Sequence, residues 1–390
     1  MRHYCTTLDH AALARGLALH QSLLAHGGKF ALTVLAMDDA AAAGLERSQA
    51  AHLRVILASE LASRFPALAG AQRDRTKREF QATCVPWLMR HLLAELPAGE
   101  RLTHLAADVY FFSSPEAVFK EVGDAPVGLV PFRPGAAVIY LEAYGRFNPG
   151  WLSLRNDAVG NAAATDWAER CAAWCFEILE PHRYGNQKYL DTWPARFPEA
   201  KVITHPGVLV APWNLPDTKI SPGPRIGGTP LIGYQFHGLA HLDRQLYDAG
   251  LEAYGASPTA ELRDVIYQPY LQQLARAEGA APALTPDLLP PARTDDPRVA
   301  TALPHLLARL RDLEVDRGAC LLAMAKNRHA AAEAMAEARR DMSEAQAISK
   351  RTFDREEAAR QLVRDSADHL RKVELDREER LKSIAFYQDK

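Results

Sequence analysis

Short apolar segments alternate with amphipathic helical segments through the first third of this 390-residue chain. Arg2 to Thr6 and Phe30 to Met37 have the composition of strands, and Ala11 to His26 between them carries apolar residues at helical spacing. The same pattern predicts strands at 54–57, 102–106 and 127–130, and a helix at 78–96. Because strands that alternate with helices pair in parallel, we expect an α/β fold: a doubly wound, mostly parallel sheet with helices on both faces.

Acidic residues follow three of the expected strands. Asp9 comes after the first strand, Asp38 and Asp39 after the second, and Asp108 after the strand near residue 102. In such sheets, ligands bind beyond the carboxyl ends of the strands. The pattern therefore predicts a ligand cleft there, although loops after strands are also acidic for solubility alone.

The segment THLAADVYFFSSP, from Thr103 to Pro115, is the most informative of these strand ends. An apolar approach through Leu102 and Leu105 meets one carboxylate, Asp108, and an aromatic continuation closes on Ser-Ser-Pro. The position two residues before Asp108 is Ala106, so a single carboxylate stands at this strand end.

The chain changes character towards its C-terminus. A helix from Leu262 to Ala277 is expected to close a first domain, 1–278, and a proline-rich linker follows at 279–298. Beyond Gly318 there is neither glycine nor proline, and apolar residues recur at steps of three and four: Leu362, Val363, Leu370, Val373, Leu381 and Ile384. This pattern predicts a long helical tail, 299–390, that buries its stripe in a coiled coil or helical hairpin, within the chain or between subunits. The alternative is a helix folded back on its own domain.

The bulk composition excludes several functions. A formal charge of -2 provides no general attraction to nucleic acid or to an anionic membrane, and 48% hydrophobic residues allow a sizeable core. No apolar run is long enough to span a bilayer, and nothing at the N-terminus resembles a signal peptide. The five cysteines are odd in number and contain no C-x-x-C pair. A reducing cytoplasm fits this composition best.

Eight phrases together resemble a family of bacterial nucleotide-diphospho-sugar transferases with the GT-A fold, similar to glycosyltransferase family 8. They cover about Met1 to Tyr270 and occur in the family's order: YCTTLDHAALARGLALHQSL, LTVLAMDD, RTKREFQAT, THLAADVYFFSSPEAVF, GRFNPGWLSLRND, YGNQKYLDTWP, HPGVLVAPWN and YQFHGL. The resemblance implies a nucleoside-diphosphate sugar as donor, a glycan or lipid-linked saccharide as acceptor, and Mn²⁺ or Mg²⁺ as a possible cofactor.

The resemblance also implies where the donor binds. Thr6, Thr7 and Asp9 would bind the base and ribose, with Asp38 beside them, although Asp9 also stands where a helix N-cap is expected. Arg75 and Lys77 would bind the diphosphate, or else they belong to a solvated helix face.

The phrase FNPGWLSLRND would shape the pocket of the donor sugar. Asn148, Trp151 and Arg155 are its candidates, with a turn at Gly150-Trp151 that lets backbone approach the ligand and an indole that stacks on a sugar ring. The alternative is that the aromatic residue belongs to ordinary core packing. Trp213 and Asn214 are similar candidates.

The metal position departs from the family in two places. Asp108 would be one metal ligand, but Ala106 replaces the first aspartate of Asp-x-Asp. The late His-Phe-x-Gly phrase of the family is here Gln235-Phe236-His237-Gly238. His237 could point the same way as Gln235 if the segment is extended. A metal site built as in the family is therefore not favoured.

The catalytic position shows a third departure. Relatives carry Asp-Gln where this chain has Asn186-Gln187, and asparagine can bind sugar hydroxyls but cannot act as a base. Asp191 is the nearest acid and is otherwise interpreted as a helix-end cap. We expect a glycosyltransferase of surface polysaccharide assembly. The alternative is a catalytically lapsed protein that binds nucleotide or glycan and acts as a scaffold through its helical tail.

Overall fold

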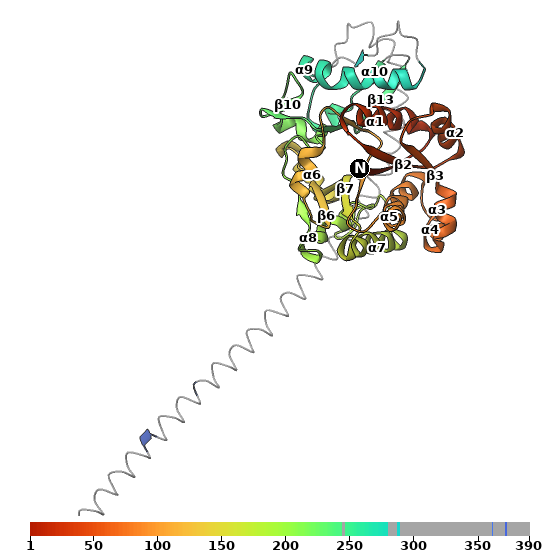
Figure 1. The fold of residues 1–390 in the computed structure, drawn as a ribbon. Helices are drawn as coiled ribbons and strands as arrows, with labels where there is room; N and C mark the ends of the chain where they lie inside the picture. The colour runs from red at the N-terminus through yellow and green to blue at the C-terminus, as the bar shows by residue number, and fades with distance from the viewer. Residues whose placement is uncertain (244–245, 280–286, 289–360, 362–370, 373–390) are drawn as a thin grey trace, which may run out of the picture. The chain divides into compact units, whose positions relative to one another are not determined.

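The computed structural model describes residues 1–243, 246–279, 287–288, 361 and 371–372 (Figure 1). The described residues up to Leu288 belong to one compact unit built around a seven-stranded sheet. Across the sheet the strands are, in spatial order, β3 (Leu53–Leu57), β2 (Phe30–Ala36), β1 (Arg2–Leu8), β4 (Arg101–Leu105), β7 (Phe147–Arg155), β6 (Val127–Pro131) and β8 (Lys201–Val202).

The sheet is mixed but mostly parallel. β1 pairs in parallel with β2 and β4, β2 pairs in parallel with β3, and β6 pairs in parallel with β8. β7 runs antiparallel to both of its neighbours, β4 and β6. The prediction of a mostly parallel sheet is thus confirmed. The expected turn at Gly150-Trp151 is wrong, because both residues lie inside β7, where Trp151 pairs with Leu105.

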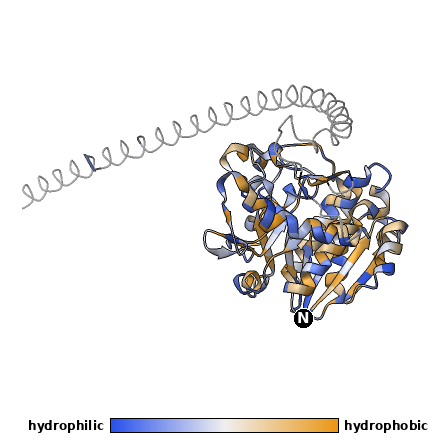
Figure 2. Cartoon of the chain, turned by 90° about the horizontal axis from the view of Figure 1, so that it is seen from above, coloured by the Kyte–Doolittle hydropathy of each residue, from blue (hydrophilic) through white to orange (hydrophobic). Residues whose placement is uncertain are grey.

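Helices cover both faces of the sheet, as predicted. Successive residues of a strand point to opposite faces, so Tyr4 and Cys5 of β1 belong to different apolar clusters. Apolar residues run along the strands between these helices (Figure 2). One face packs against α3 (Ala58–Arg64), α4 (Pro66–Ala71), α5 (Lys77–Glu95) and α7 (Ala158–Ala173), and the other against α1 (Leu13–His26), α2 (Asp39–Ser48) and α6 (Glu116–Val122).

A third apolar cluster joins α1 to the later part of the unit. The helix predicted near Leu262 to Ala277 is present as α9 (Ala260–Leu262), a π-helical turn η6 (Arg263–Tyr267) and α10 (Gln268–Ala277), and α10 packs on α1. A two-stranded antiparallel sheet of β5 (Val109–Phe111) and β12 (Gly233–Gln235) follows the carboxyl end of β4.

The remaining described elements are short. The strands are β9 (Ile220–Ser221), β10 (Arg225–Ile226), β11 (Thr229–Pro230), β13 (Ala240–Asp243), β14 (Leu246–Asp248) and β15 (Asp287–Leu288). The helical turns are η1 (His10–Ala12), η2 (Ala136–Tyr144), η3 (Lys188–Thr192), α8 (Trp193–Arg196), η4 (Pro212–Asp217) and η5 (Leu251–Tyr254).

The predicted linker and tail lie almost wholly outside the described residues. Within the linker range, Asp287 and Leu288 form β15 and pair with β14. In the part of the chain that the structure describes, no helix has both the length and the apolar character needed to cross a bilayer.

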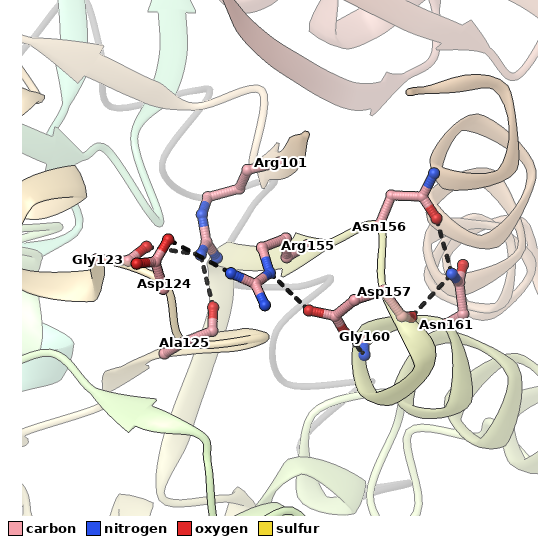
Figure 3. A network of polar contacts seen from close by, with 9 residues as sticks. All are labelled: Arg101, Gly123, Asp124, Ala125, Arg155, Asn156, Asp157, Gly160 and Asn161. Atoms are coloured by element: carbon pink, nitrogen blue, oxygen red, sulfur yellow. Dashed lines mark hydrogen bonds and ion pairs between the residues drawn. The ribbon is translucent and has the colours of Figure 1, made fainter. Parts of the chain in front are cut away.

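Arg155 lies at the end of the sheet opposite to the expected ligand site. It pairs with Arg101, the first residue of β4, whereas Asp108 follows the last residue of β4. Its guanidinium binds Asp157 at 2.6 Å and Asp124 at 3.4 Å (Figure 3). The expectation that Arg155 shapes a donor pocket is therefore wrong; it links β7 to the start of α7 and to the loop before β6.

Candidate functional site

A cavity of about 1260 Å³ lies at the carboxyl ends of β1, β2 and β4. The four carboxylates that follow these strands, Asp9, Asp38, Asp39 and Asp108, all line it. Residues from much later in the chain complete its wall, among them Asn148, Asn186, Gln187, Trp213, Gln235, His237 and Tyr254. The cavity is thus assembled at the edge where a doubly wound sheet binds its ligands.

The carboxylates after β1 and β2 also hold local backbone. Asp9 Oδ1 accepts a hydrogen bond of 3.0 Å from Ala12 N, so Asp9 both caps η1 and faces the cavity. Asp38 Oδ1 accepts from Ala41 N at 2.7 Å, and its Oδ2 accepts from His10 N at 3.1 Å. Burial alone would raise the pKa of Asp38, but these backbone N–H groups outweigh burial and the pKa lies below its usual value.

The two threonines of β1 have different positions. Thr7 lines the cavity, and its carbonyl oxygen and hydroxyl accept hydrogen bonds from Gln81 Nε2 at 3.1 and 3.3 Å. Thr6 is fully buried and does not line the cavity, because adjacent residues of a strand point to opposite faces. Only Thr7 is therefore placed to contact a ligand.

Cationic groups reach the cavity from α5 and α1. Lys77 and Arg78 line it from the first turn of α5, which begins with a reciprocal capping box between Thr76 and Glu79. Arg15 lines it from α1, and its Nη2 donates to Leu239 O at 2.6 Å. Nothing in the sequence distinguished Arg15 from other arginines, because its role depends on the fold around α1.

Arg75 does not lie with these cations. Its side chain is 1% exposed, and its guanidinium carbon lies 3.8 Å from the centre of the Phe176 ring. It donates to Asp74 Oδ1 at 2.7 Å and to Ala172 O at 3.2 Å. The structure therefore places Arg75 behind the start of α5, where it joins α5 to the chain after α7 rather than facing the cavity.

A continuous line of hydrogen bonds runs from the backbone N–H of Gly150 through the side-chain amides of Asn148 and Gln235 to the carboxylate of Asp108. Gly150 N donates to Asn148 Oδ1 at 2.8 Å, Asn148 Nδ2 donates to Gln235 Oε1 at 2.8 Å, and Gln235 Nε2 donates to Asp108 Oδ1 at 3.3 Å. We call these residues the amide chain. Asn148 and Gln235 are buried, and the amide chain brings together residues from β7, β12 and the end of β4. Asn148 thus contacts Gln235, which the sequence had marked only as a lost metal ligand.

His237 lies next to this line in a half-buried position. Its ring centre is 5.4 Å from that of Trp213 and 6.3 Å from that of Tyr254. Burial lowers the pKa of His237, Asp108 opposes this, and Arg78 and Arg15 lower it further. The imidazole is therefore neutral at pH 7 and lies within electrostatic reach of one carboxylate and two guanidinium groups.

The residues around Asp108 do not fit a divalent metal. Mn²⁺ and Mg²⁺ require several oxygen or imidazole ligands, whereas Ala106 supplies a methyl group and Gln235 presents its N–H group to Asp108. Asp108 and His237 remain as two candidate ligands. Among the described residues, no group of three or more His, Cys, Asp or Glu side chains could hold a metal ion.

Trp151 belongs to the core and not to the cavity. It is fully buried, with its ring centre 5.7 Å from that of Phe111 and 5.9 Å from that of Phe119. The indole therefore offers no free face to a sugar, and the alternative of core packing is correct. Trp213 does line the cavity and stacks on Phe132 at 4.4 Å, while Asn214 donates to the carbonyl oxygens of Phe132 and Arg133.

Of the three catalytic candidates, two reach the cavity. Asn186 and Gln187 line it, and Asn186 Nδ2 donates to Ala82 O at 2.9 Å. Asp191 does not line it. This residue lies in η3, accepts from Arg146 N at 2.7 Å, and has its pKa raised by burial. Asp191 therefore neither faces the cavity nor caps the helix end that was its alternative interpretation.

His104 of β4 is a cavity residue that sequence reasoning missed. Its Nδ1 lies 2.8 Å from Pro149 O, and because a carbonyl oxygen only accepts, Nδ1 carries the proton. Burial lowers the pKa of His104 to about 4. Among the described atoms, Nε2 has no hydrogen-bond partner. A neutral acceptor thus lies in the cavity wall, within the segment Thr103 to Pro115 in which the sequence analysis had singled out only Asp108.

The comparisons with known proteins give relatives and structural neighbours. No protein-family model matches the chain. It is similar to two uncharacterized Bacillus subtilis proteins, YfnD (27% identical over 280 residues, 70% of this chain and 89% of YfnD) and YfnF (28% over 246 residues, 60% of this chain and 80% of YfnF).

The similar solved structures include glycosyltransferases. One is the galactosyltransferase LgtC in complex with donor and acceptor sugar analogs (13% identity, 72% of this chain and 98% of LgtC, TM-score 0.45). Another is mouse xyloside xylosyltransferase 1 (13% identity, 61% of this chain and 98% of that chain, TM-score 0.39).

Proposed function

We propose that this chain is a glycosyltransferase that takes a sugar from a nucleoside-diphosphate donor and passes it to a hydroxyl of a glycan or lipid-linked saccharide. The observation that carries the proposal is that one cavity groups three kinds of polar side chain at the strand ends. Thr7, Asp9 and Asp38 suit the hydroxyls of a nucleoside, Lys77 and Arg78 suit a diphosphate, and Asn186 and Gln187 suit a sugar. The setting in surface polysaccharide assembly rests on the sequence resemblance.

In the proposed reaction the bond between the anomeric carbon and the diphosphate oxygen breaks, and its electron pair leaves with the nucleoside diphosphate. The acceptor hydroxyl oxygen bonds to the anomeric carbon, and its proton is released to solvent. Lys77 and Arg78 would stabilise the negative charge that develops on the departing diphosphate. Asn186 and Gln187 would orient the sugar by hydrogen bonds without taking the proton, because amides do not act as bases at neutral pH.

The first test is calorimetry with sugar conjugates of uridine, guanosine, thymidine and cytidine diphosphate. We expect one base to bind, and no heat with any of the four would contradict the proposal. The conjugate that binds is then assayed for hydrolysis and for transfer to a panel of saccharide acceptors. Hydrolysis or transfer of the sugar would support the proposed enzymatic activity.

Binding without turnover would support a second function, a protein that binds the nucleotide or glycan without transferring it. The observation that favours this alternative is that amides stand at positions where the resemblance implies functional groups: Asn186 in place of a carboxylate and Gln235 in place of a metal-binding histidine. The transfer assay separates the two functions, since both predict the same calorimetric result.

We further propose that residues 299–390, which lie mostly outside the described part of the chain, join subunits or bind a partner. Their apolar stripe at steps of three and four supports this proposal. A chain cut before Gly318 should keep the nucleotide affinity of the first unit and assemble with fewer subunits in each particle, which analytical sedimentation measures. The same number of subunits with and without the tail would show that the tail does not mediate assembly. We place the protein in the cytoplasm, since Cys5, Cys84, Cys171 and Cys175 are free thiols.

A further inference from the structure

We propose that this cavity binds the donor's diphosphate without a divalent metal, through the side chains of Arg15, Lys77 and Arg78. The inference rests on the proposed function, since it concerns how the same cavity holds its nucleotide. The three cationic groups would take the place of a metal, while Asp108 accepts a hydrogen bond from Gln235.

The direction of every hydrogen bond in the amide chain is fixed by one backbone group. Gly150 N can only donate, so the atom of Asn148 that it contacts at 2.8 Å must be the side-chain oxygen. Asn148 therefore presents its NH₂ group to Gln235, whose oxygen must face Asn148 at 2.8 Å. The NH₂ group of Gln235 is thereby directed at Asp108, and no reversal of either amide is compatible with Gly150.

This arrangement opposes metal binding at Asp108. A metal ion beside Asp108 would meet the positively polarised hydrogens of Gln235 instead of a ligand lone pair. Turning the Gln235 amide would place two oxygens, those of Gln235 and Asp108, against each other and leave Asn148 without its acceptor. Because both amides are buried, the lost hydrogen bonds would leave polar groups unsatisfied away from water, which disfavours the turned amide. The position that would supply another carboxylate is Ala106.

Positive charge reaches the same region from two helices. Arg78 of α5 and Arg15 of α1 are close enough to His237 for both to influence its protonation, and Asp108 does so as well. Lys77, also on the first turn of α5, is close enough to Asp38 to stabilise its charge. All three cationic side chains line the cavity, with Arg15 and Arg78 near His237 and Lys77 near Asp38, so an anion bound between these two regions would meet positive charge from both helices.

The chemistry of these cations suits a diphosphate. A guanidinium group carries a permanent charge and donates two parallel hydrogen bonds to phosphate oxygens, which a single divalent ion would otherwise neutralise. The Arg78 side chain is 73% exposed, and its contact with Glu177 is a surface ion pair at 2.7 Å. Exposed ion pairs of this kind contribute little to folding, so Arg78 can turn towards a ligand at small cost.

The deciding experiment measures the affinity of the full chain for uridine, guanosine, thymidine and cytidine diphosphate by calorimetry, once with excess EDTA and once with excess manganese chloride. We expect binding in EDTA, with an affinity within about threefold of that in manganese, a difference below the 1.4 kcal/mol that corresponds to a factor of ten. Binding only with manganese would overturn this inference and leave the proposed function intact. No binding in either buffer would overturn both.

A pair of matched variants tests the cations. In EDTA, Arg78→Gln should weaken nucleoside diphosphate binding about tenfold or more, because a charge-assisted contact to phosphate is lost. Arg73→Gln is the control: Arg73 is an exposed arginine of the same segment that does not line the cavity, and its loss should leave the affinity unchanged. Equal affinities in the two variants would contradict the role of Arg78.

The metal position is tested by adding ligands. The double variant Ala106→Asp/Gln235→His should bind manganese in a titration followed by electron paramagnetic resonance, whereas the natural chain should leave manganese free. Stoichiometric manganese binding by the natural chain would overturn the inference. Failure of the double variant to bind would show that the geometry around Asp108 excludes a metal for reasons other than the amide chain. It would thus contradict the role of the amide chain in opposing a metal.

Discussion

The side-chain amide of Asn186 donates a hydrogen bond of 2.9 Å to the carbonyl oxygen of Ala82 in α5. In a regular helix this carbonyl would accept from the N–H group four residues later, but that residue is Pro86, which has none. Asn186 therefore supplies the donor that Pro86 lacks. A carboxylate at this position could not do so, which gives a physical reason for asparagine where the family resemblance implies aspartate.

Replacement of Asn186 by aspartate should destabilise the protein. The new carboxylate would face the carbonyl oxygen of Ala82 without a hydrogen between them, in a side chain that is 9% exposed. We expect Asn186→Asp to lower the free energy of unfolding by about 1–3 kcal/mol, measured by urea denaturation. A double-mutant cycle gives the control: Asn186→Ala should cost less in a Pro86→Ala background, where residue 86 has an N–H group. Equal costs in both backgrounds would contradict this link.

The amide chain should be sensitive to any side chain at Gly150. A Cβ at this position would lie 2.9 Å from Asn148 Oδ1 and 3.0 Å from Gln235 Oε1, so Gly150→Ala would push the two amides apart. The expected loss is about 1–3 kcal/mol of stability, measured by urea denaturation. Gly70→Ala is the matched control, because Gly70 lies in α4 with open space around it and alanine should raise stability by about 0.5–1 kcal/mol. A Gly150→Ala protein as stable as the natural chain would refute the tight contact.

His104 should make the protein less stable in mild acid. Its pKa is about 4 in the folded chain and about 6.5 in an unfolded one, so between these values only the unfolded state binds the proton. The stability from this group is complete above pH 6.5 and decreases as the pH falls, by about 2 kcal/mol at pH 5. Urea denaturation at pH 7 and pH 5 measures this loss of stability.

The matched variant is His104→Asn, whose amide can still donate to Pro149 O but does not titrate. Its loss of stability between pH 7 and pH 5 should be smaller than that of the natural chain by about 2 kcal/mol. If both proteins lose the same amount, other groups cause the acid sensitivity and His104 is not buried in its neutral form.

Arg75 and Arg78 should have opposite effects although they are three residues apart. Arg75→Gln removes the buried contact with Phe176 and the hydrogen bond to Ala172 O, and should lower stability by about 1–3 kcal/mol while nucleotide affinity stays unchanged. Arg78→Gln should lower affinity with little effect on stability. Thermal unfolding and calorimetry on both variants measure the two quantities. A loss of affinity in a stable Arg75→Gln protein would restore Arg75 as a ligand of the diphosphate.

The sequence predicted the elements that depend on local pattern. The strands near Arg2, Phe30 and Arg54, the long helix after Thr76 and the positions of Asp9, Asp38 and Asp108 beyond the strands follow from periodicity and from the geometry of parallel sheets. What it did not predict depends on contacts between distant segments. The turn expected at Gly150-Trp151 lies inside β7, whose strand character depends on pairing with β4 and β6.

The misplaced site residues have the same origin. Whether a basic residue at the start of α5 faces the cavity or Phe176 depends on where the chain after α7 lies, so Arg75 and Lys77 could not be distinguished. Trp151 lies in a β-strand, and its indole contacts Phe111 and Phe119 because of the face of the sheet towards which it points. No local pattern contains the information that Gln235 meets Asp108 across 127 positions.

The pairing of β5 with β12 has a consequence for the newly made chain. Val109 pairs with Gln235, although the two residues are far apart in the sequence. The cavity residues Gln235 and His237 therefore leave the ribosome long after the first strands have been synthesised. A nascent chain that has only reached β8 holds Asp108 but neither Gln235 nor His237, and would have no complete place for a nucleotide. The proposed nucleotide would therefore stabilise this protein only after translation has passed His237, and it would not assist the folding of the first strands as they are synthesised.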